Sequence, residues 1–167
     1  ERLARTGEDW KSEQAPPITG FVFVRGPIAA HHTFDLDSYA PGSDLFLAAV
    51  NSTALTPTST ENLTASLHPS GPADIRDPAV SRDGKRVLFS MRTSRDDGHH
   101  IWLLELETRE ARQLTFVEGP LPGGGVATDR DPTFGPDGSV WFVSTRAGVV
   151  ADQGQLLDAE IYALDPG

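Results

Sequence analysis

The feature that most constrains this chain is an internal repeat. Residues 76–92 and residues 130–146 align without a gap, 54 positions apart, and seven positions coincide: Arg76/Arg130, Asp77/Asp131, Pro78/Pro132, Asp83/Asp137, Gly84/Gly138, Ser90/Ser144 and Arg92/Arg146. After a loop the match resumes, with residues 101–105 corresponding to residues 161–165. A repeat of this length indicates a supersecondary unit that is stacked on copies of itself.

A weaker third copy precedes these two. Residues 21–25 resemble the segment that ends at Arg92, and residues 44–47 resemble the segment that begins at Ile101. The pair Leu63-Thr64 resembles Leu114-Thr115. The chain therefore contains parts of three units.

Each unit is predicted to contain four short strands. An Asp-Gly pair between two apolar runs is the strongest short hairpin signal, because glycine supplies the positive φ that a tight turn needs. In the middle unit we expect strands at 77–81, 86–91, 101–106 and 111–116. Pro78 and Pro132 are expected at strand starts, where a missing N–H is tolerated.

Four-stranded units with this spacing are typical of propeller blades. The predicted fold is all-β, a partial β-propeller of about two and a half four-stranded antiparallel blades. We divide the chain into an N-terminal extension or linker (1–19), a degenerate first blade (20–66) with a long insertion (26–43), a second blade (74–116) and an incomplete third blade (127–167). The missing parts are expected from the remaining blades of a longer chain or from a protein partner.

Charge and composition restrict the partners. The formal net charge is −10, and Lys11 and Lys85 are the only lysines. Such a surface repels phosphate backbones, so nucleic acid is not an expected partner. No apolar run reaches the ~20 residues of a membrane helix, so no membrane span is expected. The absence of cysteine excludes thiolate zinc sites, thiol nucleophiles and covalent haem attachment within these residues.

Two histidine pairs are the candidates for cofactor binding. His31-His32 and His99-His100 both fall between the second and third predicted strands of their units, so they could project from one face of the propeller. Histidine binds metal or haem iron when other ligands converge, but adjacent residues of an extended chain point to opposite sides. Exposed or capping loop histidines are the favoured interpretation.

No catalytic residue and no metal site are predicted. The chain has neither a Gly-x-Ser-x-Gly elbow nor a glycine-rich phosphate loop. Asp35 and Asp37 resemble the start of a calcium loop, but the glycine and the bidentate glutamate are missing. His68, beside Pro69, is predicted to be a turn residue.

The repeated charged and aromatic residues are predicted to be structural. Asp77 with Arg92, and Asp131 with Arg146, recur at identical spacing, which favours an ion pair or a strand-end cap over a catalytic group. The aromatic residues Trp102, Trp141 and Tyr162 are predicted to lie in the core between blades, and Tyr39 in a loop.

The motifs Asp-Pro-x-x-Ser-x-Asp-Gly, Phe-Ser-x-Arg and Ile-Trp, with a closing Leu-Thr, resemble the TolB-type propeller repeat. More narrowly, residues 74–92, together with residues 21–25, the following His31-His32 and residues 42–46, resemble the middle propeller region of hydrazine synthase α-subunit-like proteins. That resemblance implies an extracytoplasmic location, periplasmic or secreted. It also implies that a haem, if there is one, lies in a flanking domain or a partner, since this chain has no Cys-x-x-Cys-His and no cofactor is expected within it.

The favoured function is a non-catalytic propeller scaffold or binding module, part of a larger extracytoplasmic protein or complex. One alternative is the propeller region of a multihaem redox enzyme, and another is the propeller cap of a serine peptidase. The chain alone is not expected to be an enzyme, and fold-level analogy says little about function because propellers host many roles.

Overall fold

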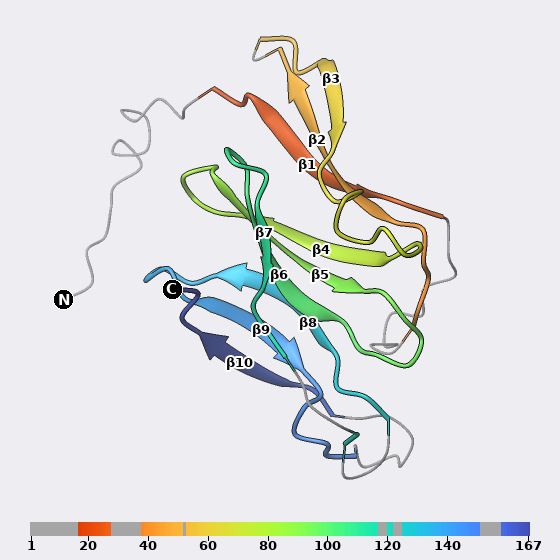
Figure 1. Cartoon of the computed structure of the whole chain (residues 1–167). Helices are drawn as coiled ribbons and strands as arrows, with labels where there is room; N and C mark the ends of the chain where they lie inside the picture. Colours follow the sequence, from red (N-terminus) through yellow and green to blue (C-terminus); the bar gives the residue numbers. More distant parts are fainter. Residues whose placement is uncertain (1–16, 28–37, 52, 117–119, 122–124, 151–157) are drawn as a thin grey trace, which may run out of the picture.

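The computed structural model describes residues 17–27, 38–51, 53–116, 120–121, 125–150 and 158–167. In these residues the chain forms three antiparallel sheets and no helix, which confirms the all-β prediction (Figure 1). The first sheet has the order β1-β2-β3, the middle sheet β4-β5-β6-β7 and the third β10-β9-β8. The strands are β1 (Gly20–Arg25), β2 (Asp44–Val50), β3 (Pro57–Asn62), β4 (Asp74–Val80), β5 (Arg86–Arg92), β6 (His100–Glu105), β7 (Ala111–Gln113), β8 (Asp129–Phe134), β9 (Val140–Ser144) and β10 (Glu160–Leu164).

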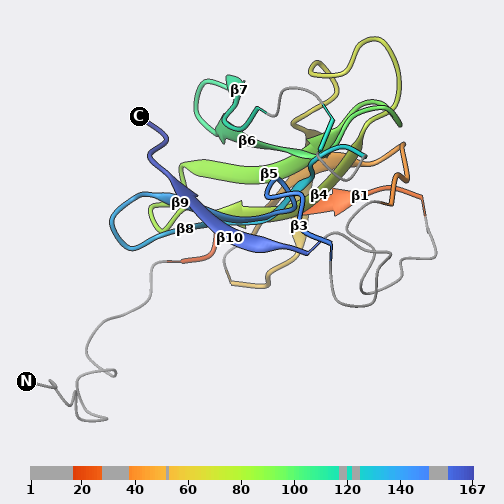
Figure 2. The same ribbon diagram turned by 90° about the horizontal axis from the view of Figure 1, so that it is seen from below.

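The three sheets are stacked face to face in sequence order. Figure 1 shows the first sheet above the middle sheet and the third sheet below it, and Figure 2 shows the same stack from below. Strand β4 contacts β1 and β2 on one side and β8 on the other. Within the described residues the first sheet has no counterpart of β4, and the third has no counterpart of β7. This arrangement fits a partial propeller.

The Asp-Gly turns form as expected. Gly84 has φ of 71° and Gly138 has φ of 89°, values that a residue with a side chain rarely adopts. Asp83 accepts hydrogen bonds from the Ser81 hydroxyl and the Lys85 N–H, and Asp137 accepts them from the N–H and hydroxyl of Ser139. Each aspartate therefore caps its own turn.

The two prolines do not lie at strand starts, so that prediction was wrong. Pro78 lies inside β4 and Pro132 inside β8, because each strand begins two or three residues before its Asp-Pro pair. The pairing register shifts there, and Asp77 and Asp131 have φ of 54° and 51°. The motif is therefore a β-bulge, where a residue without an N–H does not interrupt a ladder.

The ungapped alignment of the repeats is one residue out after the turn. Phe89 pairs with Trp102 and Phe142 pairs with Tyr162, and each pair of rings is stacked, with centroids 6.4 and 5.9 Å apart. Phe142 is therefore the structural counterpart of Phe89, 53 positions later instead of 54. The third sheet has a shorter turn, and Arg146 is not equivalent to Arg92.

The core consists of two layers between the sheets. We call the side of a sheet that is turned toward the next sheet in the sequence its forward face, and the opposite side its rear face. Leu45 and Val22 from the forward face of the first sheet pack against Val87 and Phe89 from the rear face of the middle sheet. The second layer follows the same rule, and its members are Leu88, Ile101 and Leu103 against Val140, Phe142, Tyr162 and Leu164.

The aromatic predictions hold for two of three residues. Trp102 packs against the first core layer and Tyr162 against the second. Trp141 is 46% exposed, which corrects its assignment to the core. Its structural counterpart is Leu88, which the third sheet covers, whereas no described segment covers Trp141.

The Leu-Thr pairs extend the sheets. The Leu114 N–H donates to the Ile101 carbonyl, and the Thr115 hydroxyl accepts from the Ile101 N–H. Leu63 and Thr64 make the same two bonds to Leu45. The threonine thus continues the ladder with its side chain, and β7 is shorter than the predicted strand 111–116.

Candidate functional site

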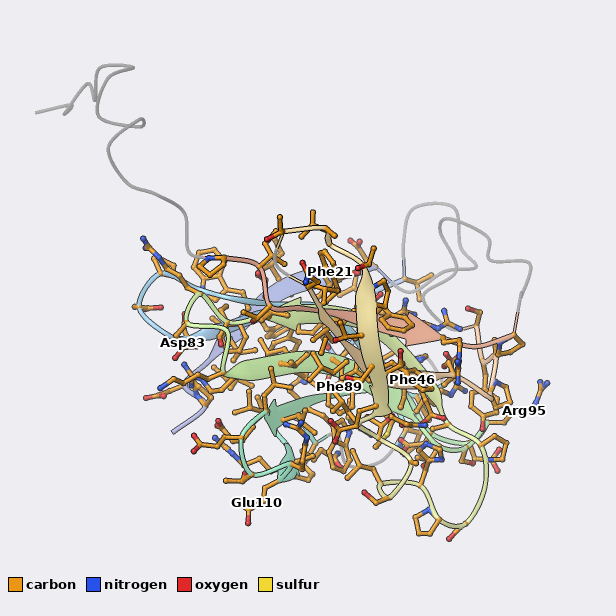
Figure 3. All side chains as sticks on the ribbon, turned by 90° about the horizontal axis from the view of Figure 1, so that it is seen from above. Phe21, Phe46, Asp83, Phe89, Arg95 and Glu110 are labelled. Atoms are coloured by element: carbon orange, nitrogen blue, oxygen red, sulfur yellow. The ribbon has the colours of Figure 1, made fainter. Side chains whose placement is uncertain are left out.

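Charged and polar residues gather at the end of the stack where β4 and β8 begin, which we call the strand-start end. In Figure 3, Arg95 marks this end and Asp83 the opposite end, with Phe89 between them. The strand-start end is also where the segments that precede β2 and β6 meet the next sheet.

A backbone seam joins neighbouring sheets at this end. The Gly42 N–H donates to the Ala73 carbonyl at 2.7 Å, and the Asp129 N–H donates to the His99 carbonyl at 2.8 Å. The Thr128 hydroxyl also accepts a hydrogen bond from the His99 N–H. Such bonds between sheets make the strand-start end one connected unit.

His99 lies inside this seam and is completely buried. Its Nε2 is 3.6 Å from an Asp74 carboxylate oxygen, which is longer than a hydrogen bond, and its Nδ1 is 3.4 Å from the Thr128 hydroxyl. Burial lowers the pKa of His99, and Asp74 opposes that shift only in part. The ring is therefore neutral at pH 7.

Asp74 is held as a carboxylate. Burial alone would raise its pKa, but His99, the Arg76 guanidinium and the Ala40 N–H bring the pKa of Asp74 well below its ordinary value. The Arg76 bonds are 2.5 and 2.7 Å, and the Ala40 bond is 2.7 Å. Arg76 also donates to Ser38, so this cluster fixes the segment before β2 onto β4.

The other histidines lie in different settings. His100 is the first residue of β6, is 9% exposed and contacts Asp97 at 3.1 Å. The expectation that this pair is exposed is therefore wrong, because the residues belong to the seam and to a strand. His31 and His32 lie outside the described residues, as do Asp35 and Asp37 of the calcium-loop hypothesis. His68 is a turn residue, as predicted, and bonds Asp44 and the Gly71 carbonyl.

The bulge aspartate Asp77 joins the middle sheet to the third. Its carboxylate accepts a hydrogen bond from Arg130 at 2.7 Å and another from the Ser90 hydroxyl at 2.9 Å. Burial would raise the pKa of Asp77, but the Arg130 bond and charge keep it below the ordinary value. Asp131 is the equivalent residue of the third sheet, and burial together with the Asp77 charge raises its pKa.

The predicted pairing of the repeated charges is different from the observed one. Asp77 pairs with Arg130 of the next sheet and not with Arg92, whose guanidinium donates to the Ser94 and Arg95 carbonyls. Arg146 pairs with the fully buried Asp129 at 2.8 Å. Sequence spacing could not reveal this, because the partner is set by the stacking of the sheets.

A surface pocket of about 420 Å³ lies at the strand-start end, beside the Asp74 cluster. The Tyr39 ring forms part of it, with Arg92 and Arg95 at 5.1 and 6.0 Å from the ring centroid. The complete lining is Tyr39, Leu67, His68, Pro69, Ser70, Gly71, Pro72 and Thr93. Tyr39 was predicted only as a loop residue, and nothing in the sequence indicated that residues 67–72 lie beside it.

Comparison with known proteins finds a likeness among solved structures. No protein-family model matches the chain, and no curated protein matches it. Among solved structures, the crystal structure of TolB from Acinetobacter baumannii is similar over 74% of this chain, with 23% sequence identity and a TM-score of 0.44. The matched region is 24% of the TolB chain, so this chain spans about a quarter of that protein.

Within the described residues there is no helix that is long and apolar enough to cross a membrane. In the same part of the chain no three His, Asp or Glu side chains lie close enough together to hold a metal ion.

Proposed function

We propose that this chain is a non-catalytic binding module that presents the strand-start end, around Tyr39, to a protein partner. One observation carries the proposal. The charged groups of this end are engaged in ion pairs, between two sheets for Asp77 with Arg130, and within one unit for Asp74 with Arg76 and for Asp129 with Arg146. Groups used in this way make a rigid platform, which suits binding by preformed surfaces.

The pocket beside this platform supports a protein segment as the ligand. It combines an aromatic ring, two prolines and a leucine with the backbone and hydroxyl groups of Ser70 and Thr93. Tyrosine is enriched among the residues that dominate protein interfaces, because it buries a large area with few rotatable bonds. The net charge of −10 favours a partner that is neutral or basic overall.

The test is capture of partners on immobilised protein, followed by calorimetric titration of each purified partner. Tyr39→Ala should weaken binding about tenfold or more, as for an interface anchor. Glu110→Gln, an exposed change far from the pocket, is the matched control and should bind as the wild type does. Equal affinity of all three proteins would refute the proposed surface.

The redox alternative concerns the same end of the molecule. A haem held by His99 or His100 would require opening the seam, since both residues are buried. This favours the scaffold proposal, with any haem in a flanking domain or a partner. An absorption spectrum of the native protein tests it: a Soret band that disappears in His100→Ala would support haem ligation by this chain.

Three further points need tests of their own. They are the source of the remaining blades, the peptidase-cap alternative and the extracytoplasmic location. The mass of the native polypeptide addresses the remaining blades and the peptidase cap together. A mass near 18.0 kDa would exclude both a covalently attached hydrolase domain and further blades in the same polypeptide. Fractionation of the source cells would show whether the protein lies outside the cytoplasm.

A further inference from the structure

A second pocket, of about 470 Å³, lies between the β4–β5 and β8–β9 turns, at the opposite end of the stack from Tyr39 (Figure 3). We call it the turn pocket. Its apolar lining comes from two neighbouring units, with Val80 from β4, Phe134 from β8 and Pro136 from the turn after β8. Val80 is 46% exposed, so part of this lining is open to solvent. The volume lies within the usual range of ligand pockets.

Two arginines line the turn pocket beside these apolar side chains. The Arg86 guanidinium lies over the Phe134 ring, 5.3 Å from its centroid. Arg82 is exposed, and in the described part of the chain its side chain makes no hydrogen bond, ion pair or ring contact. Lys85, one of only two lysines, belongs to the same turn. Three cations therefore fall within residues 82–86 of a chain whose net charge is −10.

The acidic residues near these cations leave Arg82 available. Asp83 and Asp137 each accept hydrogen bonds from a hydroxyl and an N–H of their own turns. Asp83 offsets one cation of its turn, so residues 81–86 keep a net charge of +2. Glu105 is the register partner of Arg86, but it does not line the pocket, and among the described residues it forms no ion pair with Arg86.

Comparison of the two turns shows that the fold does not need these cations. In each turn the first residue donates its N–H to the carbonyl of the last, Ser81 to Arg86 and Gly135 to Ser139. Residues 135–139 form this turn without any basic side chain. The basic residues of the middle unit are therefore an addition to the repeat, which favours a role in binding.

We propose that the turn pocket binds one acidic side chain of a protein partner, together with an apolar side chain next to it. A guanidinium donates two parallel hydrogen bonds to a carboxylate, and Arg82 is the group that can do so here. The apolar lining then covers the neighbouring side chain. The bound segment is otherwise neutral, because the field of the whole chain opposes a run of acidic residues. This surface shares no residue with the Tyr39 pocket, so it goes beyond the proposed function.

An NMR titration of isotope-labelled protein tests the proposal, with the acetylated and amidated dipeptide Glu-Leu as the probe. The amide signals of residues 80–86 and 133–138 should shift and saturate, with a dissociation constant on the order of 1 mM. The matched probes are Gln-Leu, which lacks the charge, and Glu-Ser, which lacks the apolar side chain. Each should bind about threefold more weakly or worse, because each loses one of the two contacts.

Arg82→Gln should raise the dissociation constant of the Glu-Leu probe about threefold or more, as for a partly exposed ion pair. Arg109→Gln is the matched control, because it removes the same charge from an exposed arginine outside the pocket, and it should bind as the wild type does. Equal effects of the two variants, equal binding of the three probes, or equally tight binding of inorganic phosphate would overturn the proposal.

A second copy of this acidic chain is the other occupant that the titration can detect. If it fills the pocket, the signals of residues 80–86 will move with protein concentration in the absence of any probe, and that result would overturn the proposal. Tyr39→Ala should leave the Glu-Leu titration unchanged, so this proposal and the proposed function fail separately.

Discussion

Single residues at the seam decide how closely the sheets approach. Gly98 precedes His99, and a Cβ placed on Gly98 would lie 1.7 Å from the Ala127 carbonyl oxygen. That oxygen belongs to the backbone just before β8, so it cannot move aside as the end of a flexible side chain can. Gly98, which ends the Asp-Asp-Gly turn, is therefore needed for the close packing of the middle and third sheets.

Gly98→Ala is expected to destabilise the protein by about 3 kcal/mol, in the upper range for overpacking, since backbone must shift. The free energy of unfolding from urea titration measures this. Asp96→Ala, in the same turn but exposed, is the control and should change stability by less than about 0.5 kcal/mol. A Gly98→Ala protein as stable as the control would mean that the two sheets are not in contact there.

The buried histidine gives the protein a pH dependence. The pKa of His99 is lower in the folded protein than its ordinary value, so the unfolded chain takes up a proton first as the pH falls. The contribution of the neutral ring to the free energy of unfolding is at its maximum above about pH 6.5, and it declines as the pH falls below that value. We expect the melting temperature of the wild type to decrease between pH 7 and pH 5.

Melting temperatures of His99→Gln over the same pH range isolate this contribution, because glutamine does not ionise. The variant should be less stable at pH 7 but should lose less of its stability between pH 7 and pH 5. Parallel curves for the two proteins would assign the pH dependence to other groups.

Among the elements, the bulged strands β4 and β8 carry the polar contact between the middle and third sheets. The Asp77 and Arg130 side chains are 20% and 10% exposed, so their ion pair is largely removed from water. Removing one partner of a buried pair leaves the other charge uncompensated, which is costly. The bulge itself places the carboxylate where the next sheet can reach it.

Arg130→Met should therefore cost about 3 kcal/mol, and a double-mutant cycle with Asp77→Asn should give a coupling free energy of about 1–3 kcal/mol. The exposed pair Glu61–Arg109, with side chains 50% and 40% exposed, is the matched control. Its coupling should stay below about 1 kcal/mol. Similar values for both pairs would show that burial does not strengthen the Asp77–Arg130 contact.

These strands also show what the sequence could and could not predict. The Asp-Gly turn and the apolar runs of the middle unit located β5 and β6 to within one residue at each end, because turn geometry and strand pairing are local. The bulge at Asp77-Pro78 was missed, since an Asp-Pro pair fits a strand start equally well. The pairing of Asp77 with Arg130 was missed for another reason: it forms only when two sheets stack.

For the whole molecule, the repeat predicted the stack of sheets, and the structure adds which face of each strand is covered. An error of one residue in the repeat alignment exchanges the two faces of a strand. The ungapped alignment matched Trp141 with the buried Val87, and this explains its incorrect assignment to the core. The shorter turn of the third sheet moves Trp141 to that sheet's forward face, which no described segment covers.

One pair of substitutions can measure how much a covering sheet contributes to the free energy of unfolding. Ile101 and Ile161 are the same residue type at equivalent strand positions, but one is completely buried and the other is 76% exposed. Ile101→Ala removes core contacts and should cost about 2–5 kcal/mol, whereas Ile161→Ala should cost less than about 0.5 kcal/mol in dilute, monomeric protein. Urea titrations of both variants check this. Equal costs for the two substitutions would mean that Ile161 is covered as Ile101 is.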